Sequence, residues 1–544
     1  MHFWLLAVAC CWLGLGTAVA QPITDPAPTT WGVETPQEQQ TGQADLVPNS
    51  PEAPAQEDSA VAAAPSTHTV ATPPAGGLSP ELPATESALG DAPVRYILEG
   101  IEIRGNRRTR PRVVLRYVPF EIGDVFDVED PEVELTRYRL LITGFFRDVQ
   151  FSLRRGTRRG QVILIIDVVE RNTVVVNDLW MGVSSDRDPR GVKRPLTAYG
   201  GVDVAETNLA GSGITLGSAM GVAQNQLALR VRFLDPAFTS TNWMLSAELL
   251  FNDAQDFFGN SKVEYQAPRQ DRVQSYVVLP YERFGGSAGV GHDLSVATQL
   301  WLQYRIEGIH AQVPEAASHE RGGIQPREPI RFHIQPGDSV LSALRASLQF
   351  DTRDHPFLPA RGWLTRAHGE LGLVVAGSDY SYQRLELSAS HWWSLPWRHV
   401  VRLELFGGAL VGDAPFFEHY YVGDFSDFLA SRVLGLNFDR RPSANFLGTA
   451  VAEVRRGNYV AKVGGEYRVP LYRGKNSVYG IDFFASGGAF AIASQHDLED
   501  PPIRYSGLAS VPLDLTGNLG FRLDTSGGGL TFAFSNVFGF VPAR

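Results

Sequence analysis

The feature that most constrains this chain is a regular alternation of apolar and polar residues, which begins near residue 176 and recurs through the rest of the sequence. In residues 229–233, for example, Leu, Val and Phe alternate with Arg230 and Arg232. Successive side chains of a β-strand point to opposite faces, so each strand has one apolar face and one charged face. Inward charges and outward apolar side chains are typical of a closed barrel in a bilayer. The pattern therefore predicts an all-β transmembrane β-barrel.

A soluble β-sandwich is the alternative, which would bury the apolar face in a dry core and would need shorter strands. Tryptophans near the ends of the expected strands favour the barrel, because aromatic side chains gather at membrane interfaces. These are Trp180, Trp243, Trp392, Trp393 and Trp397. The expected strands start near Asp178, Thr197, Ile214, Gln226, Asn242, Val277, Ala297, Ser339, Gly362, Tyr382, His399, Tyr459, Val478, Leu513 and Leu530. Since bacterial barrels have an even number of strands, about 16 antiparallel strands are expected, with a further one within 255–293 or an unusual end.

Two segments precede the folded part of the chain. Residues 1–20 form an apolar run that ends in Ala18-Val19-Ala20, which predicts a signal peptide, with a membrane anchor as the alternative. Residues 21–93 hold thirteen Pro, ten Asp or Glu and no Lys or Arg, which predicts a disordered, extended, acidic linker. Those ten acidic residues account for most of the formal net charge of −11, so the remainder is nearly neutral and no nucleic-acid partner is expected. Both cysteines, Cys10 and Cys11, lie in the expected signal peptide, so no disulfide or Cys-based metal site is expected after its removal.

Residues 94–175 follow a different pattern, which predicts a small α+β domain. The expected order is strand, helix, helix, strand, strand, with strands at 96–103, 149–153 and 161–169. The first helix begins at Pro111, because proline is tolerated in a first turn. The second spans 132–143, is capped by Asp130 and is closed by Gly144. The barrel would then occupy residues 176–544.

Several separated motifs of this small domain occur in the order found in one known module. They are Ile103-Arg104-Gly105-Asn106, Gly123-Asp124-Val125-Phe126-Asp127, Gly144-Phe145-Phe146-Arg147-Asp148-Val149 and Val168-Val169-Glu170. The domain resembles a POTRA domain, the polypeptide-transport-associated module of outer-membrane assembly proteins. The resemblance implies an exposed strand edge that receives client segments by strand addition. A spacer beneath the barrel is the alternative.

The expected barrel carries motifs of its own. They are Asn208-Leu209-Ala210-Gly211-Ser212-Gly213, Phe233-Leu234-Asp235-Pro236-Ala237-Phe238, a turn with Asp351, Arg353, Asp354 and Gly362, Glu466-Tyr467-Arg468-Val469-Pro470-Leu471, and Gly520-Phe521-Arg522-Leu523-Asp524. Through them the region is similar to the barrel of the BamA, TamA and Sam-type assembly factors, the bacterial surface antigen family. The resemblance implies a sixteen-stranded barrel with a weak seam between first and last strands, where client barrels are inserted by strand pairing and local bilayer thinning.

An aromatic-rich segment at 416–438 departs from the strand pattern, and we expect it to fold from the outer side into the lumen. The family carries a Val-Arg-Gly-Phe/Tyr motif there, whose arginine pairs with an aspartate of a Phe-x-Asp-x-Gly strand motif. Here the loop reads Arg432, Val433, Leu434, Gly435 and Leu436, and the strand motif reads Phe484, Ser486 and Gly488. Because both partners of a buried ion pair are absent, the loss can be nearly neutral, although the inherited mechanism is put in question. Arg432 is a candidate substitute, with Glu466 as its partner. The second departure is the end, since the strand near 530–540 resembles the family's penultimate strand.

No motif for an enzyme, a cofactor or a metal occurs in the sequence. Glycines 285–289 are explained by turns or close strand contact, and the twelve histidines lack ligand spacing. We therefore expect a non-enzymatic outer-membrane protein of a Gram-negative bacterium, with POTRA domain and linker in the periplasm. The expected function is an assembly factor whose partners are unfolded outer-membrane proteins, the lipid bilayer and accessory periplasmic proteins or lipoproteins. The alternatives are a two-partner-type secretion pore and a derived barrel paralogue without insertase activity.

Overall fold

The structure is a computed structural model that describes residues 95–184, 197–223, 225–238, 242–259, 263–266, 273–274, 276–315, 317–321, 324–421, 432–434, 436–437, 456–499 and 513–539. The expected signal peptide at 1–20 and linker at 21–93 lie outside the described residues and stay predictions. In the described part of the chain, no helix is long and apolar enough to cross a membrane. The described residues belong to one compact unit, in which a small α+β domain is followed by a large sheet.

The small domain has the element order that the sequence predicts, with one short strand added. Its elements are β1 (Arg95–Arg104), α2 (Pro111–Leu115), β2 (Val125–Asp127), α3 (Pro131–Ile142), β3 (Phe146–Arg155) and β4 (Gln161–Glu170). The sheet order is β2-β1-β4-β3, with β1 and β4 parallel and the other pairs antiparallel. The addition is β2, which extends the sheet at the β1 edge.

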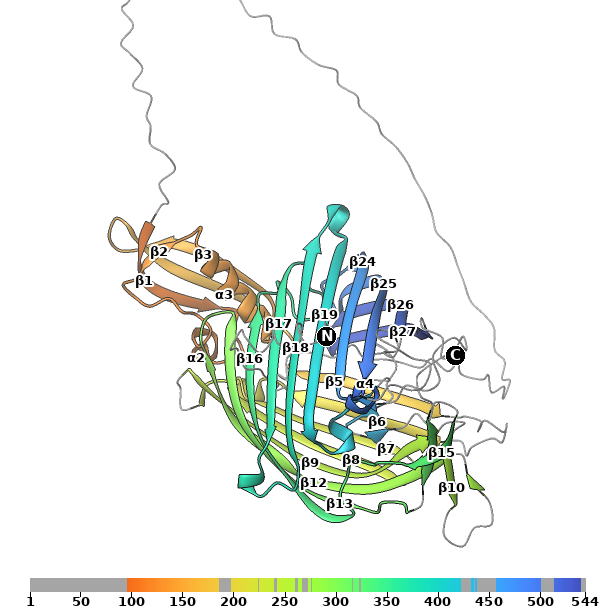
Figure 1. The fold of residues 1–544 in the computed structure, drawn as a ribbon. Helices are drawn as coiled ribbons and strands as arrows, with labels where there is room; N and C mark the ends of the chain where they lie inside the picture. Colours follow the sequence, from red (N-terminus) through yellow and green to blue (C-terminus); the bar gives the residue numbers. More distant parts are fainter. Residues whose placement is uncertain are drawn as a thin grey trace, which may run out of the picture. The chain divides into compact units, whose positions relative to one another are not determined.

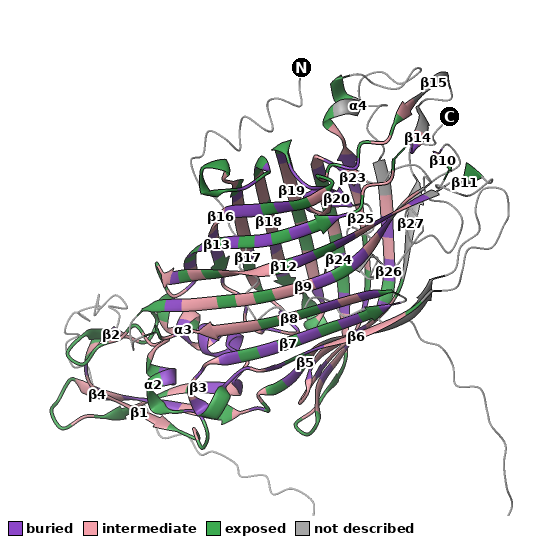
Figure 2. Ribbon diagram, turned by 90° about the horizontal axis from the view of Figure 1, so that it is seen from below, coloured by how far each residue is buried: buried purple, intermediate pink, exposed green. Residues whose placement is uncertain are grey.

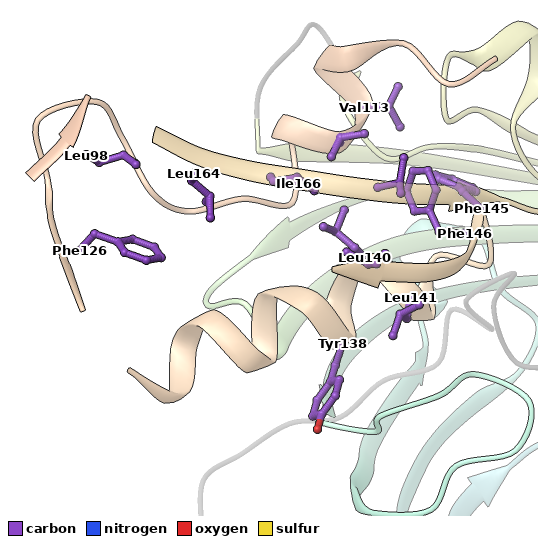
Figure 3. Close-up of a cluster of buried hydrophobic side chains, with 13 residues drawn as sticks. Leu98, Val113, Phe126, Tyr138, Leu140, Leu141, Phe145, Phe146, Leu164 and Ile166 are labelled. Carbon is purple, nitrogen blue, oxygen red and sulfur yellow. The ribbon is translucent and has the colours of Figure 1, made fainter. Parts of the chain in front are cut away.

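Local chemistry explains the longer helix of this domain. The side chain of Asp130 accepts a hydrogen bond from the backbone N–H of Glu132, and Pro131 occupies the first turn. After the helix, Gly144 has a φ of +75°, a conformation that glycine adopts without steric cost. The buried face of α3 packs on the sheet, where Leu140, Leu164 and Ile166 belong to one cluster (Figure 3). The domain thus has its own hydrophobic core.

Fifteen antiparallel strands of the described residues follow in a single sheet (Figure 1). They are β5 (Val174–Ser184), β6 (Thr197–Glu206), β7 (Thr215–Ala223), β8 (Gln226–Asp235), β9 (Trp243–Gly259), β12 (Tyr276–Asp293), β13 (Thr298–Ala311), β16 (Gly337–Asp351), β17 (Gly362–Gly372), β18 (Ser381–Ser394), β19 (Val400–Asp413), β24 (Tyr459–Arg473), β25 (Val478–Ala493), β26 (Leu513–Thr525) and β27 (Gly528–Gly539). Each pairs with its neighbour in chain order, and the sheet curves into a nearly closed barrel. The predicted fold class is therefore confirmed, and each predicted strand start lies within four residues of an observed one. The further strand considered within 255–293 is wrong, because β9 and β12 are two long strands that pair directly.

Side chains along β13 show which face of the sheet points inward. Gln299, Gln303, Arg305 and Glu307 are buried, whereas the intervening apolar side chains from Leu300 to Ile306 are exposed. The same alternation of burial runs along neighbouring strands (Figure 2). A soluble sandwich would bury the apolar face, so that alternative is wrong. The polar face lines the lumen and the apolar face meets lipid.

The tryptophans divide between these faces. Trp243, Trp393 and Trp397 are exposed, as expected of side chains at a membrane interface. Trp392 is 5% exposed and faces the lumen, with the guanidinium carbon of Arg402 at 5.3 Å from its ring centroid. Its predicted place on the outer surface is wrong, because Trp393 beside it takes the outward position. The side chain of Trp180 lies outside the described residues.

The two ends of the sheet, β5 and β27, meet without forming a ladder in the described residues. One backbone hydrogen bond crosses between them, from the N–H of Val176 to the C=O of Gly527 at 3.0 Å, beside the β26–β27 turn. Adjacent strands elsewhere in the sheet are paired along much of their length. For example, β26 and β27 are paired from Asp514 with Gly539 to Thr525 with Gly528. This junction, which we call the seam, is therefore the weakest line in the wall.

Four short strands form a separate sheet in the connections of the barrel. They are β10 (Val263–Gln266), β11 (Val273–Gln274), β14 (Ser318–Arg321) and β15 (Ile324–Pro329), in the order β11-β10-β14-β15. They lie in the connections after β9 and after β13, at the opposite barrel end from the β6–β7, β8–β9 and β12–β13 turns. A short helix, α4 (Gln495–Glu499), follows β25 at the same end. Long connections at one end and tight turns at the other are typical of outer-membrane barrels.

Candidate functional site

The connection between β19 and β24 enters the barrel as two paired arms. The first arm contains a single turn, η5 (Phe416–Glu418), and β20 (Tyr420–Tyr421), and the second contains β23 (Arg456–Gly457). Tyr420 pairs with Gly457 and Tyr421 with Arg456. A small hairpin, β21 (Arg432–Val433) with β22 (Leu436–Asn437), lies in the chain between the arms. The rest of the connection, 422–431 and 438–455, lies outside the described residues.

The first arm packs its aromatic side chains against the inner wall. Phe416 is 1% exposed, and its ring centroid lies 5.1 Å from that of Tyr281 on β12 and 5.8 Å from that of Phe258 on β9. The ring of Phe417 stacks on Tyr281 and lies beneath the guanidinium group of Arg283, 3.9 Å from its centroid. These contacts place the start of the connection inside the lumen.

Buried charges line the wall beside this arm. Glu307 accepts hydrogen bonds from Arg283 at 2.7 Å and from Arg305 at 2.5 Å. Glu370 accepts from Arg305 at 2.9 Å and from Arg345 at 2.6 Å. Each of these carboxylates has two guanidinium partners, which offsets the cost of removing a charge from water. The network runs from β12 through β13 and β16 to β17.

The predicted loop motif lies against a different part of the wall from the predicted strand motif. Leu434 has a φ of +52°, and its C=O accepts a hydrogen bond at 2.9 Å from the side-chain amide of Asn252 on β9. Its side chain packs against the buried cluster that contains Phe416. Gly435 and the side chains of Arg432, Val433 and Leu436 lie outside the described residues.

The strand motif lies on β25 and its neighbours. The hydroxyl of Ser486 accepts a hydrogen bond from Asn518 at 3.0 Å, and Phe484 lies beneath the guanidinium group of Arg522, 5.0 Å from the ring centroid. A Cβ at Gly488 would come within 2.7 Å of a backbone oxygen of β24, so this position requires glycine. Glu466 accepts from Arg522 at 2.6 Å. Leu434 thus contacts β9, whereas Ser486 contacts β26. The pairing of Arg432 with Glu466 stays a prediction.

The predicted turn motif shapes the β16–β17 turn. Arg353 donates to both carboxylate oxygens of Asp351, at 3.0 and 2.8 Å, and both residues are buried. Asp354 accepts the backbone N–H groups of residues 360 and 361 at 2.8 and 3.2 Å, and its burial raises its pKa. Gly362 has a φ of +106°, and a Cβ there would lie 2.2 Å from a backbone oxygen. These residues form a hydrogen-bonded network that shapes the turn.

The POTRA motif residues have turn and core roles. Gly105, Gly123 and Gly144 all have positive φ, and a Cβ at Gly105 would meet the backbone oxygen of Val168 at 2.0 Å. The Asn106 side chain donates to the C=O of Thr109 at 3.1 Å. Phe126 and Phe146 are 3% and 2% exposed and belong to the domain core.

A tight turn of the barrel docks on this domain. The side chain of Asn208, in the β6–β7 turn, donates to the hydroxyl of Thr109 at 2.9 Å, and the N–H of Arg110 donates to the C=O of Gly211 at 2.9 Å. A Cβ at Gly211 would lie 1.9 Å from the backbone oxygen of Arg108, and one at Gly213 would lie 2.9 Å from a methyl group of Val113. The glycines of this motif thus permit close backbone approach between domain and barrel.

Ion pairs add two further attachments. Arg116 and Arg139 both pair with Asp293, at the end of β12, at 2.7 and 2.8 Å. Arg171 pairs with Asp524, near the end of β26, at 2.9 Å. The two side chains are only 1% and 4% exposed. The second attachment lies beside the seam.

Sequence reasoning missed the lumen network and the attachments. Alternation showed that charges point inward, but pairs such as Arg305 with Glu370 join strands that are far apart in the sequence. Their partners depend on how the sheet curves. Within the described ranges, no three His, Cys, Asp or Glu side chains converge as metal ligands.

Comparisons with known proteins agree with this architecture. Residues 208–500 match the Omp85 superfamily domain, and residues 96–171 match the POTRA family, described as a surface antigen variable number repeat. The chain is 23% identical over 342 residues to the outer membrane protein assembly factor BamA of Nitratidesulfovibrio vulgaris. That alignment covers 60% of this chain and 37% of the relative, so the chain matches less than half of the relative's length.

Two solved structures are similar to this chain to different degrees. CdiB from Escherichia coli is 12% identical, with a TM-score of 0.52 and coverage of 82% of this chain and 73% of that chain. BamA from Haemophilus ducreyi lacking POTRA domains 1–3 is 15% identical, with a TM-score of 0.42 and coverage of 82% and 81%. The Omp85 match extends over more than half of the chain, and a POTRA match precedes it. The chain therefore belongs to the Omp85 superfamily and carries a POTRA domain ahead of its barrel.

Proposed function

We propose that this protein is an outer-membrane assembly factor that receives client proteins on its POTRA domain and inserts them at the seam of its barrel. Membership of the Omp85 superfamily supports a role in outer-membrane protein insertion or secretion. The similarity to an assembly factor and the barrel fold support an outer-membrane location, with the POTRA domain in the periplasm. Further expected partners are the lipid bilayer and accessory periplasmic proteins or lipoproteins.

The seam is the observation that carries the proposal. In the described residues β5 and β27 form no ladder, and one backbone hydrogen bond, from Val176 to Gly527 in the β26–β27 turn, crosses the gap. Edge strands present unpaired N–H and C=O groups that can template a further strand. A client strand that pairs with either edge gains main-chain hydrogen bonds which are costly to leave unmade in lipid. The seam therefore suits the insertion of β-strands.

The POTRA domain offers a second edge. Strand β3 pairs with β4 on one side, and a groove of about 590 Å³ lies between β3 and the start of α3. Val128, Pro131 and Phe151 contribute to the lining of this groove. The Nε of Arg137 donates to the C=O of Val149 at 2.8 Å, so this edge is capped in part by a side chain. An extended client segment could add to β3 once Arg137 is displaced.

A secretion pore is the second candidate function, since the Omp85 superfamily supports either role. A polypeptide crossing the lumen would have to displace the arms and break buried ion pairs such as Arg305 with Glu418. Insertion at the seam requires no such displacement, which favours the assembly function. A paralogue without insertase activity is the third candidate, motivated by Leu434 and Ser486.

Depletion of the protein, followed by a quantitative inventory of outer-membrane barrels and secreted proteins, tests the proposal. A general fall in barrel proteins is expected for an assembly factor. Loss of one secreted protein with unchanged barrels would instead support a secretion pore, and no change in either would support the paralogue.

A further inference from the structure

The two arms inside the lumen are not part of the barrel wall. Strand β19 pairs directly with β24, from Val400 with Arg468 through Ala409 with Tyr459, so the wall continues without the arms. The arms pair only with each other, through β20 and β23, in the part of the chain that the structure describes. Within the described residues, the arms are held in the lumen by backbone hydrogen bonds, such as that from the N–H of Phe416 to the C=O of His333 at 2.8 Å, and by side-chain contacts.

On the first arm, Glu418 provides such a contact. It is 5% exposed, and its carboxylate accepts from Arg305 and Arg384, each at 2.8 Å. Arg305 lies on β13 and Arg384 on β18, two strands that are separated in the sheet by β16 and β17. One carboxylate of the arm thus bridges two distant places on the wall.

On the second arm, Arg456 provides a contact of opposite charge. Its guanidinium group pairs with Asp256 on β9 at 2.5 Å, and Asp256 is 1% exposed. The same group lies over the rings of Phe258 and Phe416, at 4.3 and 4.9 Å from their centroids. Phe416 belongs to the first arm, so Arg456 also joins the two arms.

The contacts of Glu418 and Arg456 with the wall are ion pairs, unlike the contacts of an apolar core. Their wall partners, Arg305, Arg384 and Asp256, are on the polar, lumen-facing side of the sheet, where charges released from a pair can be hydrated again. Undocking the arms would take Glu418 away from Arg305 and Arg384, and Arg456 away from Asp256, so each pair favours the docked position. Neither Glu418 nor Arg456 takes part in the ladder between β19 and β24.

We propose that Glu418 and Arg456 are positioning residues, which form an ionic latch that holds the arms and the β21–β22 hairpin inside the lumen. The latch would keep the lumen side of the barrel fixed while clients are handled at the seam, and this consequence rests on the proposed function. The latch itself is independent of that function and is tested separately.

The accessibility of Leu434 reports on the latch. It lies on the hairpin between the arms and packs against the wall. After residue 11 the sequence contains no cysteine, so Leu434→Cys introduces a single reactive thiol once Cys10 and Cys11 are removed or replaced by Ser. The full-length protein in liposomes is treated with a membrane-impermeant maleimide, and the labelling rate is measured. Folding is checked by heat-modifiable migration in gels.

Glu418→Gln in this background is expected to accelerate labelling by about tenfold or more, because Arg305 and Arg384 lose a shared anion. Glu404→Gln is the matched control, because the partners of Glu404, which are Arg402 at 2.5 Å and Lys462 at 3.5 Å, lie on the wall strands β19 and β24. It is expected to leave the rate unchanged, and Glu418→Asp is expected to restore most of the protection. Equal rates for Glu418→Gln and the parent protein, or equal acceleration by Glu404→Gln, would overturn the latch.

If Glu418→Gln does not fold, the double variant Asp256→Asn with Arg456→Gln serves instead. It removes both charges of the second pair, so no buried charge is left alone, and it is expected to accelerate labelling in the same way. An unchanged rate in this folded variant would also overturn the proposal. The labelling result decides the latch whether or not the protein inserts clients, so the two proposals can fail separately.

Discussion

At the scale of single residues, the carboxylate of Glu170 holds the loop through which the POTRA domain meets the barrel. It accepts the N–H of Thr109 at 2.7 Å and that of Arg108 at 3.0 Å. Burial alone would raise the pKa of Glu170, but these backbone donors hold it below its ordinary value of 4.5. Its contribution to stability is therefore complete above pH 4.5 and is lost as the pH falls through the lower pKa of the folded state.

Glu170→Gln is expected to weaken this loop by about 1 kcal/mol, since the group is only partly buried. Hydrogen exchange of the amides of Arg108 and Thr109 in the full-length protein at pH 7 should accelerate about fivefold. Below pH 4.5 the wild-type protein should lose the same protection, and the variant should change less. Glu102→Gln, in the same sheet, is the control. Unchanged exchange in Glu170→Gln would show that the carboxylate does not hold the loop.

Gly211 lies at a close approach between the backbones of the two parts. Its φ is +72°, and a Cβ would overlap the backbone oxygen of Arg108 at 1.9 Å. Gly211→Ala should therefore loosen the docked turn, with a cost of about 1–3 kcal/mol, and increase protease cleavage between the domain and the barrel. Gly123→Ala shares the positive φ, at +103°, but would meet nothing within 4 Å. An equal increase in cleavage in both variants would show that backbone strain alone, and not the lost approach of the turn, causes the cleavage.

At the scale of elements, strand positions could be predicted well from the sequence because apolar and polar residues alternate with a period of two. The same alternation predicts which face each side chain takes, and it fails at Trp392, where two aromatic residues stand side by side. The partners of inward charges could not be predicted. Glu418 and Arg305 are brought together only by the curvature of the sheet and the entry of the arm, which no local pattern records.

The number of strands shows a similar limit. Two long strands, β9 and β12, occupy the region where an even strand number predicts a further strand, and the strand at 528–539 ends the sheet of the described residues. Whether the loop motif keeps its family role also depends on three-dimensional contacts. Leu434 meets Asn252 and Ser486 meets Asn518, so apolar packing and neutral hydrogen bonds occupy the positions at which the resemblance implies an ion pair.

The free edge of β3 makes a prediction at this scale. Arg137→Ala removes the side chain that donates a hydrogen bond to the C=O of Val149, which leaves this acceptor open to a client backbone. An extended client peptide should therefore bind the full-length protein more tightly. One hydrogen bond is worth about 0.5–1.5 kcal/mol, which corresponds to an affinity gain of about two- to tenfold in a titration. Arg158→Ala is the control of equal charge, on the exposed β3–β4 turn. Equal changes in both variants would indicate a charge effect and argue against strand addition at β3.

At the scale of the whole molecule, the barrel combines a firm interior with a weak seam. Buried ion pairs join β12, β13, β16, β17 and β18 to the first arm, and further pairs fix the POTRA domain at Asp293 and Asp524. Across the seam there is one backbone hydrogen bond in the described residues. Strain applied to the wall should therefore separate β5 from β27 before other strands.

A disulfide across the seam tests this account most directly. A Cβ at Gly528 would lie 3.8 Å from the Cβ of Val175, within the range of about 3.5–4.5 Å found in disulfides. The double variant Val175→Cys with Gly528→Cys therefore allows the seam to be locked by oxidation. Gly528 has a φ of +123°, so the strain of substitution is present in both redox states and cancels when they are compared.

The measurement is the rate at which a client barrel folds into liposomes that contain this variant, with Val175→Cys alone under the same oxidant as the control. Insertion should fall to the rate of empty liposomes when the seam is oxidised, a loss of about tenfold or more, and should return on reduction. Equal rates in the oxidised and reduced states would contradict the account, because clients would then be inserted without opening the seam.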